Sequence, residues 1–368
     1  MGTSFPTKSD ELTAEWLTTA LRDNGALGDG AVTQVTCEGV GEQGQTGECF
    51  KLALEYGGDR GQAPDTLVAK VSPPHEEIRG QMHAMGLYER EVRFYEHFGA
   101  DAGISVPGCF GAHIDSETGD FLLLLEDMSE CRNGDFWVSN LEDTQTAVDA
   151  AAKMHARWWK SPKLAEAAWL KQHDNVDYNE TLLGAVIRGV LPVAEEKFPE
   201  HLTGNLLQAA RKLAEGWEGF IHHDEGDDFT LVHGDFHPKQ MFFPQDGAGR
   251  FAVFDWQTAA ASVPGEDLAR ILYMGQRSAD LRDSRAALLQ RYLDGLTKGG
   301  VEYDLGRVER SVQQGLMISL FITVFASATS DVAILDEAAS ARGVDYRERM
   351  FTDLGEVIED FQATDVLG

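Results

Sequence analysis

Two short apolar runs that each lead to an aspartate constrain this chain most. Residues 229–232 are followed by His233, Gly234 and Asp235, and residues 251–254 lead directly to Asp255. Residues 241–243 and a Pro-Gln-Asp-Gly-Ala-Gly turn lie between the runs and predict a hairpin. A strand that ends in a carboxylate places it at the mouth of a core, where it must be paired, hydrogen-bonded or bound to metal. Two such carboxylates on neighbouring strand ends would suit a divalent cation and a proton transfer.

The catalytic loop of the aminoglycoside phosphotransferases and choline kinases has the pattern His-Gly-Asp-x-x-x-x-Asn, and residues 233–240 resemble it. Only Gln240, which replaces the final asparagine, departs from the pattern. Phe254-Asp255-Trp256 stands where the same group, and more distantly the protein kinases, carry a metal-binding aspartate. The resemblance extends from about residue 35 to about residue 330. It implies an α+β, bilobal protein-kinase-like fold with a small antiparallel-sheet lobe and a large, mainly helical lobe.

A glycine-rich hairpin and a strand that contains a lysine precede this motif. Residues 32–41 and 48–56 predict the two hairpin strands, and Gly41 and Gly44 lie where backbone N–H groups can approach an anion. By itself such a turn is also consistent with a hairpin tip that binds nothing. Lys70 lies inside the apolar strand 66–72, so it must find a negative partner or stay solvated.

A helix over residues 87–98 offers that partner. One carboxylate lies on its apolar face at helical spacing, and the members of that face are Leu87, Glu91, Phe94, Tyr95 and Phe98. The order of glycine hairpin, strand lysine and helix glutamate resembles the small lobe of kinase-like proteins, where a Lys–Glu ion pair positions the nucleotide phosphates. The resemblance therefore implies that Lys70, Glu91, Gly41 and Gly44 bind ATP.

Two more strands, over residues 106–113 and 120–125, complete an expected five-stranded antiparallel sheet with one packed helix besides a lead helix over residues 9–28. The resemblance implies that the backbone of Glu126 and Met128, in the segment between the lobes, receives the adenine. We expect an N-terminal nucleotide-binding lobe over residues 1–126 and a C-terminal catalytic and substrate-binding lobe over residues 127–368. In the second lobe, His155 on a helix over residues 144–159 and Asp267 at a helix N-terminus are interpreted as structural.

The resemblance also assigns catalytic roles. Asp235 would accept the hydrogen bond of a substrate hydroxyl and take its proton. Asp255 would bind Mg²⁺, with Gln240 supplying a neutral oxygen, and such hard oxygen ligands suit this ion. Lys70, held by Glu91, would bind the α- and β-phosphates. The extra methylene of Gln240 moves its amide oxygen by roughly 1.5 Å relative to asparagine, which puts a second metal in question.

Composition excludes one class of partner. The formal net charge is −30, with 31 Lys and Arg against 61 Asp and Glu, which argues against binding to nucleic acid. The acids are spread along the whole chain, so a solvated acidic surface is one interpretation and an acidic pocket for cationic substrates is the other.

The sequence also bears on the compartment. Residues 1–10 show no secretory signal pattern, and no apolar run approaches the roughly 20 residues of a membrane span. Four cysteines show neither metal-ligand spacing nor disulfide density. We expect a cytoplasmic protein without a membrane partner, and the oligomeric state stays open.

Three functional classes remain. The first is an ATP- and Mg²⁺-dependent kinase that phosphorylates a hydroxyl of a small molecule, and the second is a nucleotide-binding pseudokinase that acts as a scaffold. A protein kinase is disfavoured because the sequence shows no Ala-Pro-Glu motif after Asp255. The Leu-Leu-Glu-Asp-Met and Ala-Arg-Trp-Trp segments resemble the ecdysteroid-kinase-like branch, which favours a fairly apolar acceptor. An antibiotic-modifying aminoglycoside phosphotransferase stays open, because the acidic charge favours a cationic acceptor.

Overall fold

The chain divides into two units in its computed structural model, which describes residues 5–40, 47–172, 182–222, 228–340 and 343–367. The first unit is Met1–Arg132 with Phe242–Thr258, and the second is Asn133–Met241 with Ala259–Gly368. The chain therefore first passes from one unit to the other at residues 132–133, a few residues after the boundary predicted at residue 126. The return of residues 242–258 to the first unit differs from the predicted lobes, and its physical basis is the close stack of Trp256 on Phe94, with ring centroids 3.8 Å apart.

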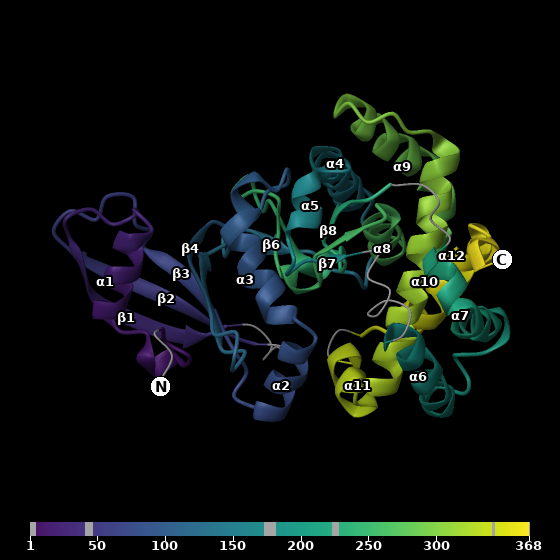
Figure 1. The fold of residues 1–368 in the computed structure, drawn as a ribbon, viewed down its shortest axis with the longest axis horizontal. Coiled ribbons are helices and arrows are strands. Elements are labelled where there is room, and N and C mark those ends of the chain that lie inside the picture. Colours follow the sequence, from purple (N-terminus) through teal and green to yellow (C-terminus); the bar gives the residue numbers. More distant parts are fainter. Residues whose placement is uncertain (1–4, 41–46, 173–181, 223–227, 341–342, 368) are drawn as a thin grey trace. The chain divides into compact units, whose positions relative to one another are not determined.

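A five-stranded sheet forms the centre of the first unit (Figure 1). Its strands are β1 (Ala31–Gly39), β2 (Glu48–Gly57), β3 (Thr66–Val71), β4 (Cys109–Ile114) and β5 (Phe121–Glu126). They pair in the order β1-β2-β3-β5-β4, and every pairing is antiparallel. The predicted five-stranded antiparallel sheet is confirmed. Because β3 is central, Lys70 is held by strands on both sides of it.

In the described part of this unit three α-helices accompany the sheet, rather than the lead helix and single packed helix that were predicted. They are α1 (Ala14–Asp23), α2 (Glu76–Ala84) and α3 (Leu87–His97), with short 3₁₀ turns η1 (Ser9–Glu11) and η2 (Gly99–Asp101). The predicted lead helix begins later, at Ala14, because the side chain of Thr13 accepts a hydrogen bond from the backbone N–H of Trp16. Helix α1 packs against β1 and β4, whereas α3 packs against β4 and β5.

The two aspartates follow strands of different sheets. Strand β8 (Thr230–Val232), which precedes Asp235, pairs with β11 (Ala260–Ser262) in the order β7-β11-β8, with β7 at Lys171–Gln172. Strand β10 (Ala252–Val253), which precedes Asp255, pairs with β9 (Met241–Phe243) in the order β10-β9-β6, with β6 at Arg132–Asn133. The prediction of neighbouring strand ends is therefore wrong, although the hairpin between residues 241 and 253 is present. The short 3₁₀ turn η5 (Trp256–Thr258) follows Asp255.

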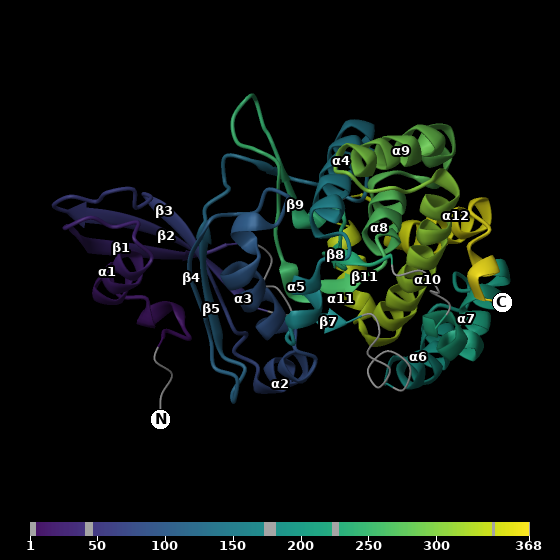
Figure 2. The same cartoon turned by 45° about the horizontal axis from the view of Figure 1, so that its top comes forward.

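The second unit is mainly helical, as Figure 2 shows. Its α-helices are α4 (Leu141–Trp158), α5 (Pro162–Glu166), α6 (Leu183–Lys197), α7 (Gly204–His222), α8 (Gly265–Gly275), α9 (Ser278–Lys298), α10 (Leu305–Thr329), α11 (Val332–Ser340) and α12 (Leu354–Asp360). The remaining helical turns are η4 (Pro238–Gln240), the π-helical η6 (Glu348–Asp353) and η7 (Ala363–Leu367).

Helix α10 forms the centre of this unit, because it packs along both α8 and α6. It approaches α8 so closely that a Cβ atom on Gly315 would lie 1.8 Å from the carbonyl oxygen of Gly265. Only glycine permits this approach. Helix α10 is long and apolar enough to cross a membrane, but 67% of that apolar window is buried within the protein. Such burial is typical of the core helix of a soluble domain.

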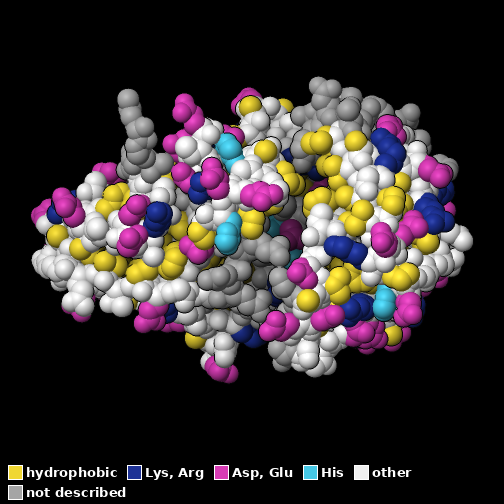
Figure 3. Space-filling view, turned by 90° about the horizontal axis from the view of Figure 1, so that it is seen from below, with side chains coloured by type: hydrophobic (Ala, Val, Ile, Leu, Met, Phe, Trp, Pro, Cys, Tyr) yellow, Lys and Arg dark blue, Asp and Glu magenta, His cyan; other side chains and the backbone are white. Residues whose placement is uncertain are grey.

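The acidic composition is visible at the surface. Acidic side chains are scattered over the face shown in Figure 3 and do not collect in one patch there. This distribution is the one expected of a solvated acidic surface, the first of the two interpretations given above. The four cysteines are unpaired.

Candidate active site

The loop over residues 233–240 in the second unit, the candidate catalytic loop, is fixed by a buried carboxylate. Asp267, in the first turn of α8, accepts hydrogen bonds from the backbone N–H groups of His233, at 2.8 Å, and Gly234, at 2.9 Å. Gly234 has a φ of 81°, in the left-handed region that glycine adopts readily. The loop therefore turns sharply just before Asp235. Asp267 is structural as predicted, but it binds the loop rather than the N-terminus of its own helix.

A buried histidine completes this anchor. The Nε2 atom of His155 lies 3.3 Å from Oδ2 of Asp267, and its Nδ1 lies 2.7 Å from the hydroxyl of Tyr292. The ring of His155 is fully buried on α4. Its predicted structural role is confirmed, since both ring nitrogens are engaged inside the helical core.

The carboxylate of Asp235 is surrounded by three donors. Its Oδ1 accepts hydrogen bonds from Nη2 of Arg270 at 2.6 Å and from Nε of the same guanidinium at 3.1 Å. Its Oδ2 lies 3.1 Å from Nε2 of His237 and accepts a hydrogen bond from Nε2 of Gln240 at 3.2 Å. Burial would raise the pKa of Asp235, but His237 and Arg270 hold that pKa well below its usual range. Asp235 is therefore ionised at neutral pH.

An aromatic side chain lies beside His237, one of the partners of Asp235, within the second unit. The Phe136 ring packs edge-on against His237, with centroids 5.9 Å apart, and the ammonium of Lys239 lies 5.4 Å from the centre of the Phe136 ring. The ring of Trp137 packs against that of Phe136, with centroids 4.3 Å apart. These contacts place an apolar, aromatic surface beside the catalytic loop.

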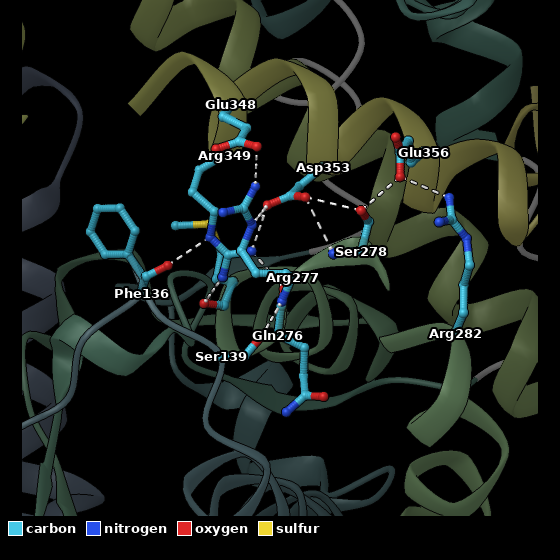
Figure 4. A network of polar contacts seen from close by, with 11 residues as sticks. Phe136, Ser139, Gln276, Arg277, Ser278, Arg282, Glu348, Arg349, Asp353 and Glu356 are labelled. Carbon is cyan, nitrogen blue, oxygen red and sulfur yellow. Dashed lines mark hydrogen bonds and ion pairs between the residues drawn. The ribbon is translucent and has the colours of Figure 1, made fainter. Parts of the chain in front are cut away.

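Phe136 is held by a buried arginine of the C-terminal segment (Figure 4). Arg349, only 2% exposed, donates from Nε to the carbonyl oxygen of Phe136 at 2.7 Å. Its other nitrogens donate to the carbonyl oxygens of Met274 and Gln276 and to Asp353. Arg349 thus ties η6, the end of α8 and the segment before α4 together, and it fixes the backbone that carries the aromatic surface.

A second cluster lies in the first unit, around Lys70. The Nζ atom of Lys70 is 2.8–2.9 Å from both carboxylate oxygens of Glu91 and 2.8 Å from Oδ1 of Asp255. Burial alone would lower the pKa of Lys70, but Asp255 and Glu91 together raise it above its ordinary value. The predicted ion pair between Lys70 and Glu91 is present. Asp255 adopts a φ of 65°, which is uncommon for a non-glycine residue and marks a constrained position.

Gln257 and Arg90 brace this cluster. The side-chain amide of Gln257 donates to Oε2 of Glu91 at 3.2 Å, and Nε of Arg90 donates to the carbonyl oxygen of Gln257 at 2.8 Å. Arg90 is buried, although it lies outside the apolar face predicted for this helix. Together with the stack of Phe94 on Trp256, these bonds hold α3 against the segment that carries Asp255.

The remaining predicted nucleotide ligands lie at the end of β5 or outside the described residues. Glu126 ends β5 and accepts a hydrogen bond from the backbone N–H of Gly108 at 2.9 Å, and Met128 is buried. Gly41 and Gly44 fall within residues 41–46, which lie outside the described part of the chain. The proposed phosphate contacts of these two glycines therefore remain predictions.

The predicted metal ligands differ in how well they suit Mg²⁺. Asp255 keeps a quarter of its side chain exposed, and a carboxylate there is the hard oxygen donor that this ion prefers. Gln240 donates its amide N–H to Asp235, so only its amide oxygen remains for a metal. No group of three or more His, Cys, Asp or Glu side chains suited to a metal occurs among the described residues. Asp255 fits a Mg²⁺ that takes most of its ligands from phosphates and water.

Sequence reasoning missed Arg270 and Gln257. Arg270 lies one helical turn after Asp267 on α8, so the i, i+3 spacing could have placed both side chains toward the catalytic loop. Gln257 lies two residues after Asp255, in a 3₁₀ turn that the pattern did not predict. Neither residue belongs to the motifs from which the site was predicted.

These features define a kinase-like protein, with an antiparallel-sheet unit that carries the Lys–Glu pair and a helical unit that carries the catalytic loop. A protein from Ralstonia eutropha JMP134 that is assigned to the aminoglycoside phosphotransferases has a similar structure. Its TM-score is 0.52, and it is 17% identical over 96% of this chain and 98% of its own. A choline/ethanolamine kinase family protein from Mesorhizobium loti has a TM-score of 0.50 and 17% identity over 91% of this chain and 93% of its own. At such identity the likeness establishes the fold alone, and it confirms the predicted fold class.

The family follows from the sequence. The ecdysteroid kinase-like family model matches residues 43–300, and the chain belongs to this family. Comparison with curated protein sequences gives no significant match. The protein is thus a member of a kinase-like phosphotransferase family, as the resemblance of its catalytic loop predicted.

Proposed function

We propose that this protein is a cytoplasmic, ATP- and Mg²⁺-dependent phosphotransferase that transfers the γ-phosphate to a hydroxyl group of a small molecule. The observation that carries the proposal is the ionised Asp235, held on a rigid loop by Arg270 and by the anchor at Asp267. Phosphoryl transfer depends mainly on positioning and charge neutralisation. A fixed carboxylate that aligns a hydroxyl, together with a buried lysine that binds phosphate, supplies these two needs.

Each cluster would contribute one part of the reaction. Asp235 would accept the hydrogen bond of the acceptor hydroxyl and take its proton as the bond between that oxygen and the γ-phosphorus forms. The bond from the γ-phosphorus to the bridging oxygen breaks at the same time, and ADP leaves. Lys70, held in place by Glu91 and Gln257, binds the α- and β-phosphates. Asp255 would hold Mg²⁺, and the ion would supply neutralisation of phosphate charge. The backbone around Glu126 and Met128 would receive the adenine, and Gly41 and Gly44 would approach the phosphates.

The surroundings of Asp235 favour a neutral, fairly apolar acceptor. The side chains that contact Asp235 are cationic or neutral, and the nearby surface of Phe136 and Trp137 is aromatic. A polycationic aminoglycoside would meet Arg270 and Lys239 near the reacting hydroxyl. This environment supports an alcohol of the kind that the family name suggests, such as a sterol-like compound, over an antibiotic. We propose no nucleic acid or membrane partner.

A nucleotide-binding pseudokinase is the second candidate, and one contact favours it. The side-chain amide of Gln240 donates a hydrogen bond to Asp235. In this arrangement Gln240 binds the carboxylate of Asp235 instead of a metal ion. A scaffold protein would need only the cluster around Lys70 to bind ATP. Both candidate functions predict that the protein binds a nucleotide, but only the phosphotransferase predicts turnover.

A metal-dependent screen of ATP consumption separates them. Purified wild type and the Asp235→Asn variant are tested with ATP and Mg²⁺ against pooled alcohols: sterols, phenols, sugars, amino alcohols, aminoglycosides and hydroxyacyl thioesters. The phosphotransferase predicts Mg²⁺-dependent turnover with one pool, lost in the variant. ATP-induced thermal stabilisation without turnover in every pool would favour the pseudokinase.

A further inference from the structure

Arg270 is fixed on both sides of its guanidinium. Its Nη1 donates to the hydroxyl of Tyr273 at 2.8 Å, while Nε and Nη2 both donate to Oδ1 of Asp235. The side chain is 10% exposed and rises from α8, the helix whose Asp267 also holds the backbone of the catalytic loop. Helix α8 therefore controls both the backbone before Asp235 and one oxygen of its carboxylate.

The two oxygens of Asp235 have partners of different kinds. Two N–H groups of one charged, buried side chain engage Oδ1, which makes this the strongest contact of the carboxylate. The partners of Oδ2, His237 and Gln240, are longer contacts at 3.1 and 3.2 Å. Gln240 is the more exposed of the two, since His237 is only 7% exposed. An incoming hydroxyl can therefore replace the Gln240 amide on Oδ2 more readily than it can displace Arg270 from Oδ1.

We propose that Arg270 is a positioning residue for phosphoryl transfer: it engages Oδ1 of Asp235 and leaves Oδ2 as the oxygen that receives the acceptor hydroxyl. The inference rests on the proposed function, because it assigns a geometry to the same carboxylate. It also gives Gln240 a second role, since its amide holds Oδ2 until the hydroxyl takes its place. The motif that identifies the loop contains neither Arg270 nor this choice of oxygen.

The test compares Arg270→Met, which removes the charge at similar length, with Arg270→Lys, which keeps the charge but offers a single nitrogen. Tyr273→Phe removes the second anchor of the guanidinium and leaves every partner of Asp235 in place. For each variant kcat and KM for ATP are measured with the acceptor pool that turns over, or with water as acceptor when ATP hydrolysis depends on Asp235. Thermal unfolding with and without Mg²⁺-ATP checks folding and nucleotide binding.

Arg270→Met is expected to lower kcat by about a hundredfold, the range of a misplaced catalytic group, with KM for ATP unchanged within about twofold. Arg270→Lys should recover part of the loss, and Tyr273→Phe should show a smaller loss of kcat. A kcat equal to that of wild type in Arg270→Met overturns the inference and leaves the phosphotransferase intact. Loss of kcat without any recovery in a folded Arg270→Lys variant also overturns it. Absence of Asp235-dependent turnover in wild type removes the proposed function, and the inference with it.

Discussion

The ammonium of Lys70 lies 2.8 Å from the carboxylate of Asp255, although 185 residues separate them in the sequence. The same ammonium pairs with Glu91, so one cation satisfies two carboxylates inside the first unit. Removal of Lys70 would leave these carboxylates facing each other without a counter-charge.

Lys70→Met is therefore expected to cost about 3–5 kcal/mol of unfolding free energy, as when one partner of a buried ion pair is removed. It should also abolish stabilisation by ATP. Urea unfolding and a thermal shift with Mg²⁺-ATP measure the two effects. The matched control is Lys51→Met on the neighbouring strand β2, because the Lys51 side chain is 33% exposed against 12% for Lys70 and pairs with the single carboxylate of Asp127. Its loss should cost about 1 kcal/mol or less. Equal costs for the two variants would contradict the account.

Arg349→Met should destabilise the second unit by about 3–5 kcal/mol, because three carbonyl oxygens lose their buried donor. Asp353 also loses one of its two arginine partners, although Arg277 and Ser278 still donate to it. If the variant folds, KM for the acceptor should rise more than KM for ATP, since the Phe136 backbone loses its support. The control is Arg282→Met, which removes an exposed arginine paired with Glu356 and Asp360 and should change the unfolding midpoint little. A loss of unfolding free energy in Arg282→Met as large as that in Arg349→Met would refute this prediction.

The contribution of Asp235 to the free energy of unfolding should decrease at acidic pH. Its folded pKa lies below its unfolded value of about 3.9, so the contribution is complete above that unfolded value and is lost as the pH falls through the folded pKa. The cost of Asp235→Asn, about 3 kcal/mol for a carboxylate that keeps a quarter of its side chain exposed, should thus be present in full at pH 5. It should shrink below about pH 4. Urea titrations across this range measure it, and a cost that grows with acidity would be the contrary result.

Gln240→Leu should raise the Mg²⁺ concentration needed for half-maximal turnover by about tenfold if the amide oxygen of Gln240 is a metal ligand. Gln240→Asn, which restores the residue of the family pattern, is the matched control and should keep the wild-type requirement. Mg²⁺ titrations of ATP turnover measure both. An unchanged requirement in Gln240→Leu would assign Gln240 to Asp235 alone.

The sequence predicted the contact between two elements whose buried faces show clear periodicity, and it predicted the loop that matches a family motif. The strand over residues 66–71 and the apolar face of α3 predicted the pair of Lys70 with Glu91, because strand and helix periodicities define which side chains are buried. Residues 233–240 indicated the family because the spacing of their motif is specific. The anchor of Asp267 was anticipated only in its structural role.

Contacts between elements far apart in the sequence escaped prediction. Arg270 meets Asp235 because α8 packs beside the loop, and Gln257 meets Glu91 because a 3₁₀ turn follows Asp255. The turn at Gln257 leaves no periodic signal in the sequence, and the i, i+3 spacing of Asp267 and Arg270 indicates only that the two side chains share one face of α8. The two short sheets around β8 and β10 were also predicted as one, because strands of two or three residues carry too little pattern to define their partners.

Direct detection of the transferred phosphate tests the central claim. Wild type and Asp235→Asn are incubated with Mg²⁺ and ATP labelled in the γ-phosphate, together with the pool of neutral alcohols, and the products are analysed by mass spectrometry. We expect a labelled phosphate monoester of one alcohol with wild type and none with Asp235→Asn, while Mg²⁺-ATP stabilises both proteins. Equal amounts of that ester with both proteins, or no ester in any pool despite nucleotide binding, would contradict it.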